Sequence, residues 1–176
     1  MRRRTKAREH AVQFLYHLDL RGDEAMADVE RFLDAAEVED RESPDLDPSA
    51  RREREPSRGG RRDRELRDFS LRLIEGTRTH RAEVDAILAG VTRNWDLRRM
   101  AAVDRNILRM AIYELLHCSD IPPKVTINEA IELGKRFSTA NSGSFINGIL
   151  DRVRIDLQKG ALGEPAAPEQ TMEHNP

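Results

Sequence analysis

The stretch VDRNILRMAIYELL, residues 103–116, decides the fold class of this chain of 176 residues. Its apolar side chains recur every three or four positions, the spacing that places them on one face of an α-helix. The members of this apolar face are Val103, Ile107, Leu108, Ala111, Ile112, Leu115 and Leu116. SDIPP, residues 119–123, ends the helix, because proline cannot continue the helical hydrogen bonds. The sequence therefore predicts a long core helix here.

The same spacing predicts further helices on both sides of this stretch. They lie at about residues 5–19, 24–36, 63–79, 84–91, 127–137 and 145–157, with a short helical piece at 98–102. Thr126 and Glu129 stand at the spacing of a capping box, which predicts that the helix after the prolines starts at Thr126. No alternating pattern of useful length indicates a β-strand, so the predicted fold class is all-α.

Two segments have the composition of disordered chain. Residues 38–62, VEDRESPDLDPSARREREPSRGGRR, contain three prolines, a Gly-Gly pair and no aromatic residue. Such a segment buries too little apolar area to offset its ordering entropy. Its arginines allow phosphate contacts, but a solvated linker is favoured because the charges largely cancel. We expect one helical domain over residues 1–160, with this insertion inside it, and a frayed tail over 161–176.

The overall composition restricts location and partners. The formal net charge is −2, so a nucleic-acid surface must be a local patch and not a property of the whole molecule. The single cysteine, Cys118, excludes an internal disulfide and a zinc site of several cysteines. No apolar run approaches the roughly 20 residues that cross a bilayer, and no secretory signal follows the basic start. We therefore expect a cytoplasmic protein without membrane contact.

The N-terminal segment MRRRTKAR is the strongest local charge feature. Its cations are Arg2, Arg3, Arg4, Lys6 and Arg8. Clustered arginines suit contacts with phosphates, which supply a salt-sensitive part of nucleic-acid affinity. The alternative is a tail that only improves solubility, and the segment alone does not distinguish the two.

Two aromatic residues could extend an RNA surface. Tyr16 follows the basic segment but lies off the apolar stripe of its helix, and Phe145 opens the last helix next to a Ser-Gly turn. Unpaired bases commonly stack on aromatic rings. Both rings could instead belong to the core, and composition favours this second interpretation.

Catalytic and metal-binding motifs are not evident. His10, His80 and His117 are isolated along the chain, and neither a Gly-rich phosphate loop nor a nucleophile elbow accompanies them. Cys118 follows His117, but adjacent helical residues point in different directions. We therefore expect no catalytic residues, no metal site and no cofactor.

Four segments together resemble the NusB family of transcription antitermination factors. They are AREHAVQFLY (7–16), WDLRRMAAVDRNILRMAIYELL (95–116), DIPPKVTINEAIELGKRFS (120–138) and SFINGILD (144–151). They occur in the family's order and cover most of the chain outside the insertion and the tail. The resemblance implies two packed three-helix bundles.

The resemblance also implies a function. A NusB-type factor is a non-enzymatic adaptor that binds boxA-type single-stranded RNA together with the ribosomal protein NusE. It joins RNA polymerase and other Nus factors and supports ribosomal RNA transcription. Carried over by position, the N-terminal cations would hold phosphates, and Tyr16 and Phe145 would lie along the RNA path. Asp104 and its neighbour Arg105 would contact NusE, where complementary charge sets orientation and on-rate.

Three alternatives stay open at this point. The chain could be a purely protein-binding helical scaffold, or a homodimer could cover the RNA surface. It could also be the accessory RNA-binding domain of a ribosomal RNA methyltransferase, in which a NusB-like module precedes the catalytic domain. The chain ends soon after its last predicted helix, which leaves no room for a cofactor-binding α/β domain and favours the free-standing factor.

Overall fold

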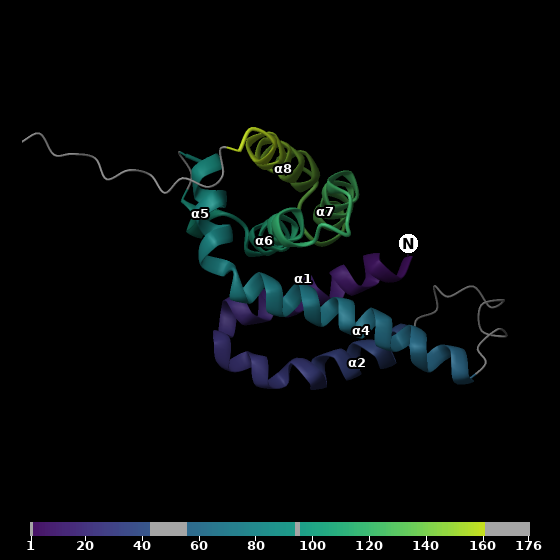
Figure 1. Cartoon of the computed structure of the whole chain (residues 1–176). Coiled ribbons are helices and arrows are strands. Elements are labelled where there is room, and N and C mark those ends of the chain that lie inside the picture. The colour runs from purple at the N-terminus through teal and green to yellow at the C-terminus, as the bar shows by residue number, and fades with distance from the viewer. Residues whose placement is uncertain (1, 43–55, 94–95, 161–176) are drawn as a thin grey trace, which may run out of the picture.

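The computed structural model describes residues 2–42, 56–93 and 96–160, and every regular element in these ranges is a helix (Figure 1). The prediction of an all-α fold is therefore confirmed for the described residues. The α-helices are α1 (Arg2–Arg21), α2 (Val29–Glu42), α4 (Pro56–Thr79), α5 (Arg81–Val91), α6 (Ala102–His117), α7 (Pro123–Phe137) and α8 (Ser142–Gln158). Two short 3₁₀ helices, η1 (Asp23–Asp28) and η2 (Leu97–Arg99), precede α2 and α6.

The helices form two groups that pack on each other (Figure 1). One group contains α1, α2 and α4. The other contains α6, α7 and α8, with α5 packed against α6 and α8. The two bundles implied by the family resemblance are thus present, with α5 as an additional helix in the second. Since α1 contacts both α4 and α6, it joins the groups.

Helix α6 lies at the centre of the fold. All residues from Asn106 to Glu114 are buried, including the charged Arg109 and Glu114. A helix that is buried on all sides has neighbours on all sides, and α6 packs against α1, α4, α5, α7 and α8. Its apolar stripe is only part of the buried surface, because polar side chains fill the side that faces α1 and α5.

The predicted insertion is shorter than the sequence indicates. Helix α2 continues to Glu42 and α4 already begins at Pro56, so residues 38–42 and 56–62 are helical and the prediction of disorder is wrong for them. Asp40 supports the end of α2, because it forms an ion pair with Lys6 of α1 and lies 3.1 Å from Nε2 of His10 on the same helix. The remainder of the insertion, residues 43–55, and the tail, residues 161–176, lie outside the described residues.

The predicted capping box is also wrong. Helix α7 begins at Pro123, which suits the first turn because proline has the required φ and needs no amide donor there. Thr126 therefore lies inside the helix, where its hydroxyl donates a hydrogen bond of 3.1 Å to Glu114. Glu129 accepts a bond of 3.1 Å from the Thr5 hydroxyl. Contacts with α1 and α6 thus replace the local cap.

Candidate nucleic-acid interface

The first turn of α1 presents exposed cations. Arg3 and Arg4 are both exposed, whereas the side chain of Arg2 lies outside the described part of the chain. The Arg4 guanidinium lies 5.0 Å from the centroid of the Phe69 ring and 3.9 Å from Asp120. Arg3 and Arg4 line a groove of about 390 Å³ together with residues of α4. The first turn therefore keeps cations available to a ligand such as a phosphate.

Lys6 is half-buried and already has two acidic partners. Its ammonium group lies 2.8 Å from Asp40 and 3.1 Å from Glu9. Burial by itself would lower the pKa of Lys6, but the hydrogen bonds to Asp40 and Glu9 outweigh it and raise the pKa above its ordinary value. Lys6 stays charged, and a phosphate has to compete with two carboxylates for it.

Arg8 does not fit the predicted phosphate contact. Its side chain is only 2% exposed, and its Nε and Nη2 each donate a hydrogen bond of 2.8 Å to the Glu114 carboxylate. Glu129 lies 3.6 Å from its third nitrogen. The prediction for Arg8 is therefore wrong, because an approaching phosphate would have to break a buried ion pair. The helical spacing that puts Arg8 on the face of Ala11 and Leu15 is the signal that could have excluded it.

Tyr16 provides an exposed ring on the same helix. It is 38% exposed and shares one face of α1 with the exposed Gln13 and Leu20. At a rise of 1.5 Å per residue, Tyr16 lies about 18 Å along the helix from Arg4. Tyr16 and the first-turn cations therefore occupy the two ends of α1, and a ligand that contacts both has to run along the helix.

Phe145 lies in the first turn of α8, half-buried against the core. Two contacts fix this turn. Ser142 donates a hydrogen bond of 3.0 Å to Asp104 of α6, and a Cβ at Gly143 would lie 3.0 Å from Lys135 of α7. The starts of α6 and α8 thus meet the end of α7 beside Phe145, and some of its ring surface stays accessible.

Asp104 and Arg105 have partners inside the fold. Asp104 is 7% exposed and uses one oxygen to hold Ser142, while its other oxygen is buried without a hydrogen bond. Arg105 donates hydrogen bonds to Asp19, at 2.5 Å, and to the Leu97 and Met100 carbonyls. Neither side chain presents its charge on the surface, so the structure offers no exposed carboxylate at the position predicted to contact NusE.

Helix α7 contributes two cations that sequence reasoning missed. Lys135 and Arg136, in its last turn, have side chains that are 57% and 60% exposed. Arg136 pairs with Glu9 of α1, which places it between the two ends of that helix. The adjacent Lys-Arg pair is the sequence signal that could have found them. We define the α1–α7 edge by its accessible residues, Arg3, Arg4, Lys6, Tyr16, Lys135, Arg136 and Phe145.

The structure also brings together three possible metal ligands that the sequence did not connect. One ligand atom from each of His80, Glu83 and His117 lies within 4.8 Å of the others. The expectation that the chain lacks a metal site was based on the separation of the two histidines. The spacing of His80 and Glu83, three residues apart at the start of a helix, was the available signal. This group is separate from the α1–α7 edge.

None of the described helices is both long and apolar enough to span a membrane. The α1–α7 edge is instead a surface with cations and rings. Several of these cations already have carboxylate partners, and Glu9, the partner of both Lys6 and Arg136, has a side chain that is only 5% exposed.

Comparison with known proteins agrees with the fold and the sequence segments. The NusB family profile matches residues 5–154. The transcription antitermination protein NusB of Syntrophus aciditrophicus is 41% identical over 168 residues, which are 96% of this chain and 89% of that protein.

Solved structures show the same architecture. NusB of T. maritima superposes with a TM-score of 0.65 at 35% identity, over 87% of this chain and 91% of that one. A crystal structure of antitermination factors NusB and NusE with double-stranded RNA has a chain with a TM-score of 0.63 at 23% identity, over 87% of this chain and 96% of that one. Profile, sequence identity and coverage agree: the chain belongs to the NusB family.

Proposed function

We propose that this protein is a transcription antitermination factor that binds boxA-type single-stranded RNA together with NusE and so supports ribosomal RNA transcription. Family membership and the name of the relative from Syntrophus aciditrophicus support the antitermination role. The structure of NusB with NusE and double-stranded RNA supports the two partners by analogy. RNA polymerase and other Nus factors complete the proposed assembly.

One observation carries the RNA part of this proposal. The α1–α7 edge combines the exposed ring of Tyr16 with exposed cations nearer the start of α1: Arg3 and Arg4 in its first turn, and Arg136 of α7, which pairs with Glu9. Rings that stack on bases and cations that contact phosphates are the two elements of single-strand recognition. The domain over residues 1–160 would therefore act as a binding adaptor without catalysis, in the cytoplasm where transcription takes place.

The NusE part takes a different form from the direct contact that the family resemblance implies. We propose that Asp104 shapes the partner surface indirectly, because its bond to Ser142 fixes the start of α8. Arg105 would act in the same way through Asp19. An exposed residue next to Asp104 and Arg105 would then contact NusE, and the inward-facing side chains of Asp104 and Arg105 would hold that residue in position.

A titration of labelled boxA RNA, with and without NusE, tests the proposal. We expect weak binding by the protein alone and tighter binding in the presence of NusE. A scrambled RNA of the same composition is the control. Equal affinity for both RNAs in the presence of NusE would contradict sequence-specific recognition.

A purely protein-binding scaffold is the second candidate. The observation in its favour is that Lys6, Lys135 and Arg136 each have a carboxylate partner within the chain. In that case RNA would leave the amide signals of residues 2–16 unchanged, whereas the proposed function requires them to shift.

A further inference from the structure

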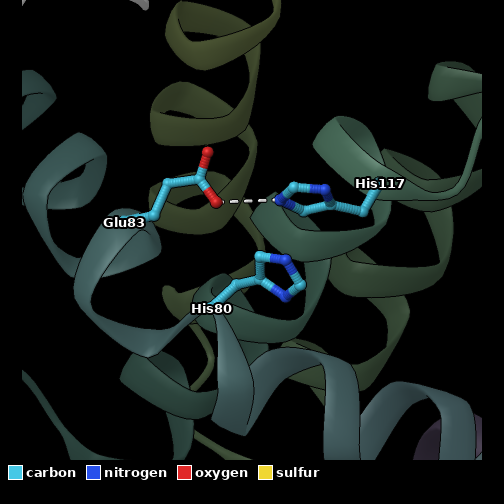
Figure 2. Close-up of side chains that lie close together, drawn as sticks. All are labelled: His80, Glu83 and His117. Atoms are coloured by element: carbon cyan, nitrogen blue, oxygen red, sulfur yellow. Dashed lines mark hydrogen bonds and ion pairs between the residues drawn. The ribbon is translucent and has the colours of Figure 1, made fainter.

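His80, Glu83 and His117 lie together at the junction of three helices (Figure 2). His80 links α4 to α5, Glu83 lies in the first turn of α5, and His117 is the last residue of α6. The two imidazole rings have centroids 3.9 Å apart, and His117 Nε2 lies 2.9 Å from Glu83 Oε2. His80 and Glu83 are neighbours in the sequence, whereas His117 joins them from 34 residues beyond Glu83.

The hydrogen bond made by His80 leaves a nitrogen available for a metal ion. His80 Nδ1 lies 2.9 Å from the Gly76 carbonyl oxygen, which can only accept. The proton of the neutral ring is therefore on Nδ1, and Nε2 keeps its lone pair. Metal-ligating histidines typically use their second nitrogen in this way, to donate to a carbonyl or carboxylate that orients the ring.

A buried aromatic ring holds both histidines in place. Tyr113 stacks on His117, with centroids 5.4 Å apart and an interplanar angle of 27°, and its centroid is 5.6 Å from that of His80. Gly76 makes room for Tyr113, since a Cβ there would lie 2.0 Å from the Tyr113 Cζ. The potential ligands are thus supported by packed helices, which lowers the entropy lost when they bind an ion.

The donor set indicates the kind of ion. Two imidazole nitrogens and one carboxylate oxygen suit zinc and neighbouring divalent transition metals, whereas magnesium and calcium prefer oxygen ligands throughout. Ligands at about 2.0–2.2 Å around a tetrahedral zinc ion lie about 3.3 Å from each other. Spacings from 2.9 Å to 4.8 Å approach this arrangement through small side-chain rotations.

We propose that His80, Glu83 and His117 bind one divalent transition-metal ion, with zinc as the favoured ion and water at the fourth position. Glu83 and His117 are exposed, so both the ion and the water can reach the site. A bound ion would connect the start of α5 to the end of α6. Because the ion would bind the folded chain and not the unfolded chain, it would raise the stability of the fold.

Titration of the full chain with Zn²⁺, followed by calorimetry, tests the site. We expect one ion per chain, and we expect Co²⁺ at the same site to give the visible absorption of a tetrahedral ion. His80→Ala and His117→Ala should each weaken Zn²⁺ binding about tenfold or more, because each removes one of three protein ligands. Zn²⁺ should raise the melting temperature of the parent chain and leave that of both variants nearly unchanged.

His17→Ala is the matched control, because His17 is a partly exposed histidine of α1 outside the cluster. It should bind Zn²⁺ as the parent does. Circular dichroism of each variant confirms that the helices are intact. The proposal is overturned if the parent chain binds no Zn²⁺ at micromolar concentrations. It is also overturned if His80→Ala and His117→Ala bind as tightly as the parent, which would assign binding to other histidines.

Discussion

Two arginines of α1, one helical turn apart, have opposite environments. The side chain of Arg4 is 55% exposed and lies at the edge of a groove, whereas that of Arg8 is 2% exposed and bound at both ends of its guanidinium to Glu114. Both belong to the same basic segment. The comparison shows that membership of a basic cluster does not define a role, because the neighbours of each position decide whether an arginine is a ligand contact or part of the core.

The same contrast recurs at the other end of α1. Asp19 is buried among Arg81, Arg105 and Arg109, and Arg109 also pairs with Asp85. Breaking a buried ion pair leaves a charge without solvation, whereas exposed pairs are weak and screened by salt. The interface of α1 and α6 is therefore stabilised by two buried ionic clusters, one around Glu114 and one around Asp19. Most of the cations of the α1–α7 edge are instead exposed.

The largest expected effect comes from Arg8→Met. The change leaves Glu114 buried without its arginine, so we expect the free energy of unfolding to fall by about 3–5 kcal/mol. Urea denaturation measures it. Arg4→Met is the matched control and should cost about 1 kcal/mol or less, because its ion pair is exposed. Similar losses in the two variants would remove the distinction between these arginines.

Asp19→Asn should have the next largest effect, about 1.5–3 kcal/mol, the range for hydrogen bonds to charged groups. The loss is smaller than for Arg8 because Arg109 retains Asp85 and Arg105 retains two carbonyls. Urea denaturation at neutral pH measures it. A parent-like stability would show that the cluster around Asp19 contributes little.

Acidification should reveal the same cluster. Burial by itself would raise the pKa of Asp19, but the hydrogen bond from Arg105 and the charge of Arg109 lower it below its ordinary value of 3.8. The carboxylate therefore contributes its full stability above pH 3.8 and loses it as the pH falls through the lower, folded pKa. Unfolding free energies measured across this range should fall less steeply for Asp19→Asn than for the parent.

Tyr16→Ala tests the exposed half of the comparison. If the ring stacks on a base, RNA affinity falls by about 1–3 kcal/mol, while the unfolding free energy changes by only about 0.5 kcal/mol, as for most surface positions. Fluorescence titration in the presence of NusE gives the affinity. Gln13→Ala, on the same exposed face, is the control and should leave it unchanged. A variant that melts early and binds normally would place Tyr16 in a structural role.

The smallest change is expected for Arg3→Ala combined with Arg4→Ala. Each phosphate contact on single-stranded RNA contributes about 0.7 to the slope of log affinity against log salt, so loss of both contacts reduces the slope by about 1.4. Arg152→Ala, in the second half of α8, removes an exposed cation outside the edge and is the control. An unchanged slope in the double variant would exclude the first turn from the RNA site.

Helical spacing predicted most of the fold and part of the site. It located α1, α4, α6, α7 and α8 and ended α6 at the prolines, because apolar spacing and proline act locally. It misjudged the start of α7, where Thr126 contacts Glu114, and both ends of the insertion, where the α2 end is held by the pair of Asp40 with Lys6. For the site it named Arg3 and Arg4, which are exposed, but it left the exposure of Tyr16 open because composition favoured the core. It also assigned the buried Arg8 to a phosphate contact and omitted Lys135 and Arg136.

The sequence by itself determined the all-helical class, the order of the helices and the family. The fold class and the order of the helices depend on spacing within a few residues. The family depends on whole segments of sequence that can be compared directly with those of relatives. Tertiary structure alone decided which charges are buried and which histidines meet. Arg8 pairs with a carboxylate 106 positions away, and His80 meets His117 across two helices. Such pairs depend on how helices pack in space, and the spacing within either helix carries no information about the other.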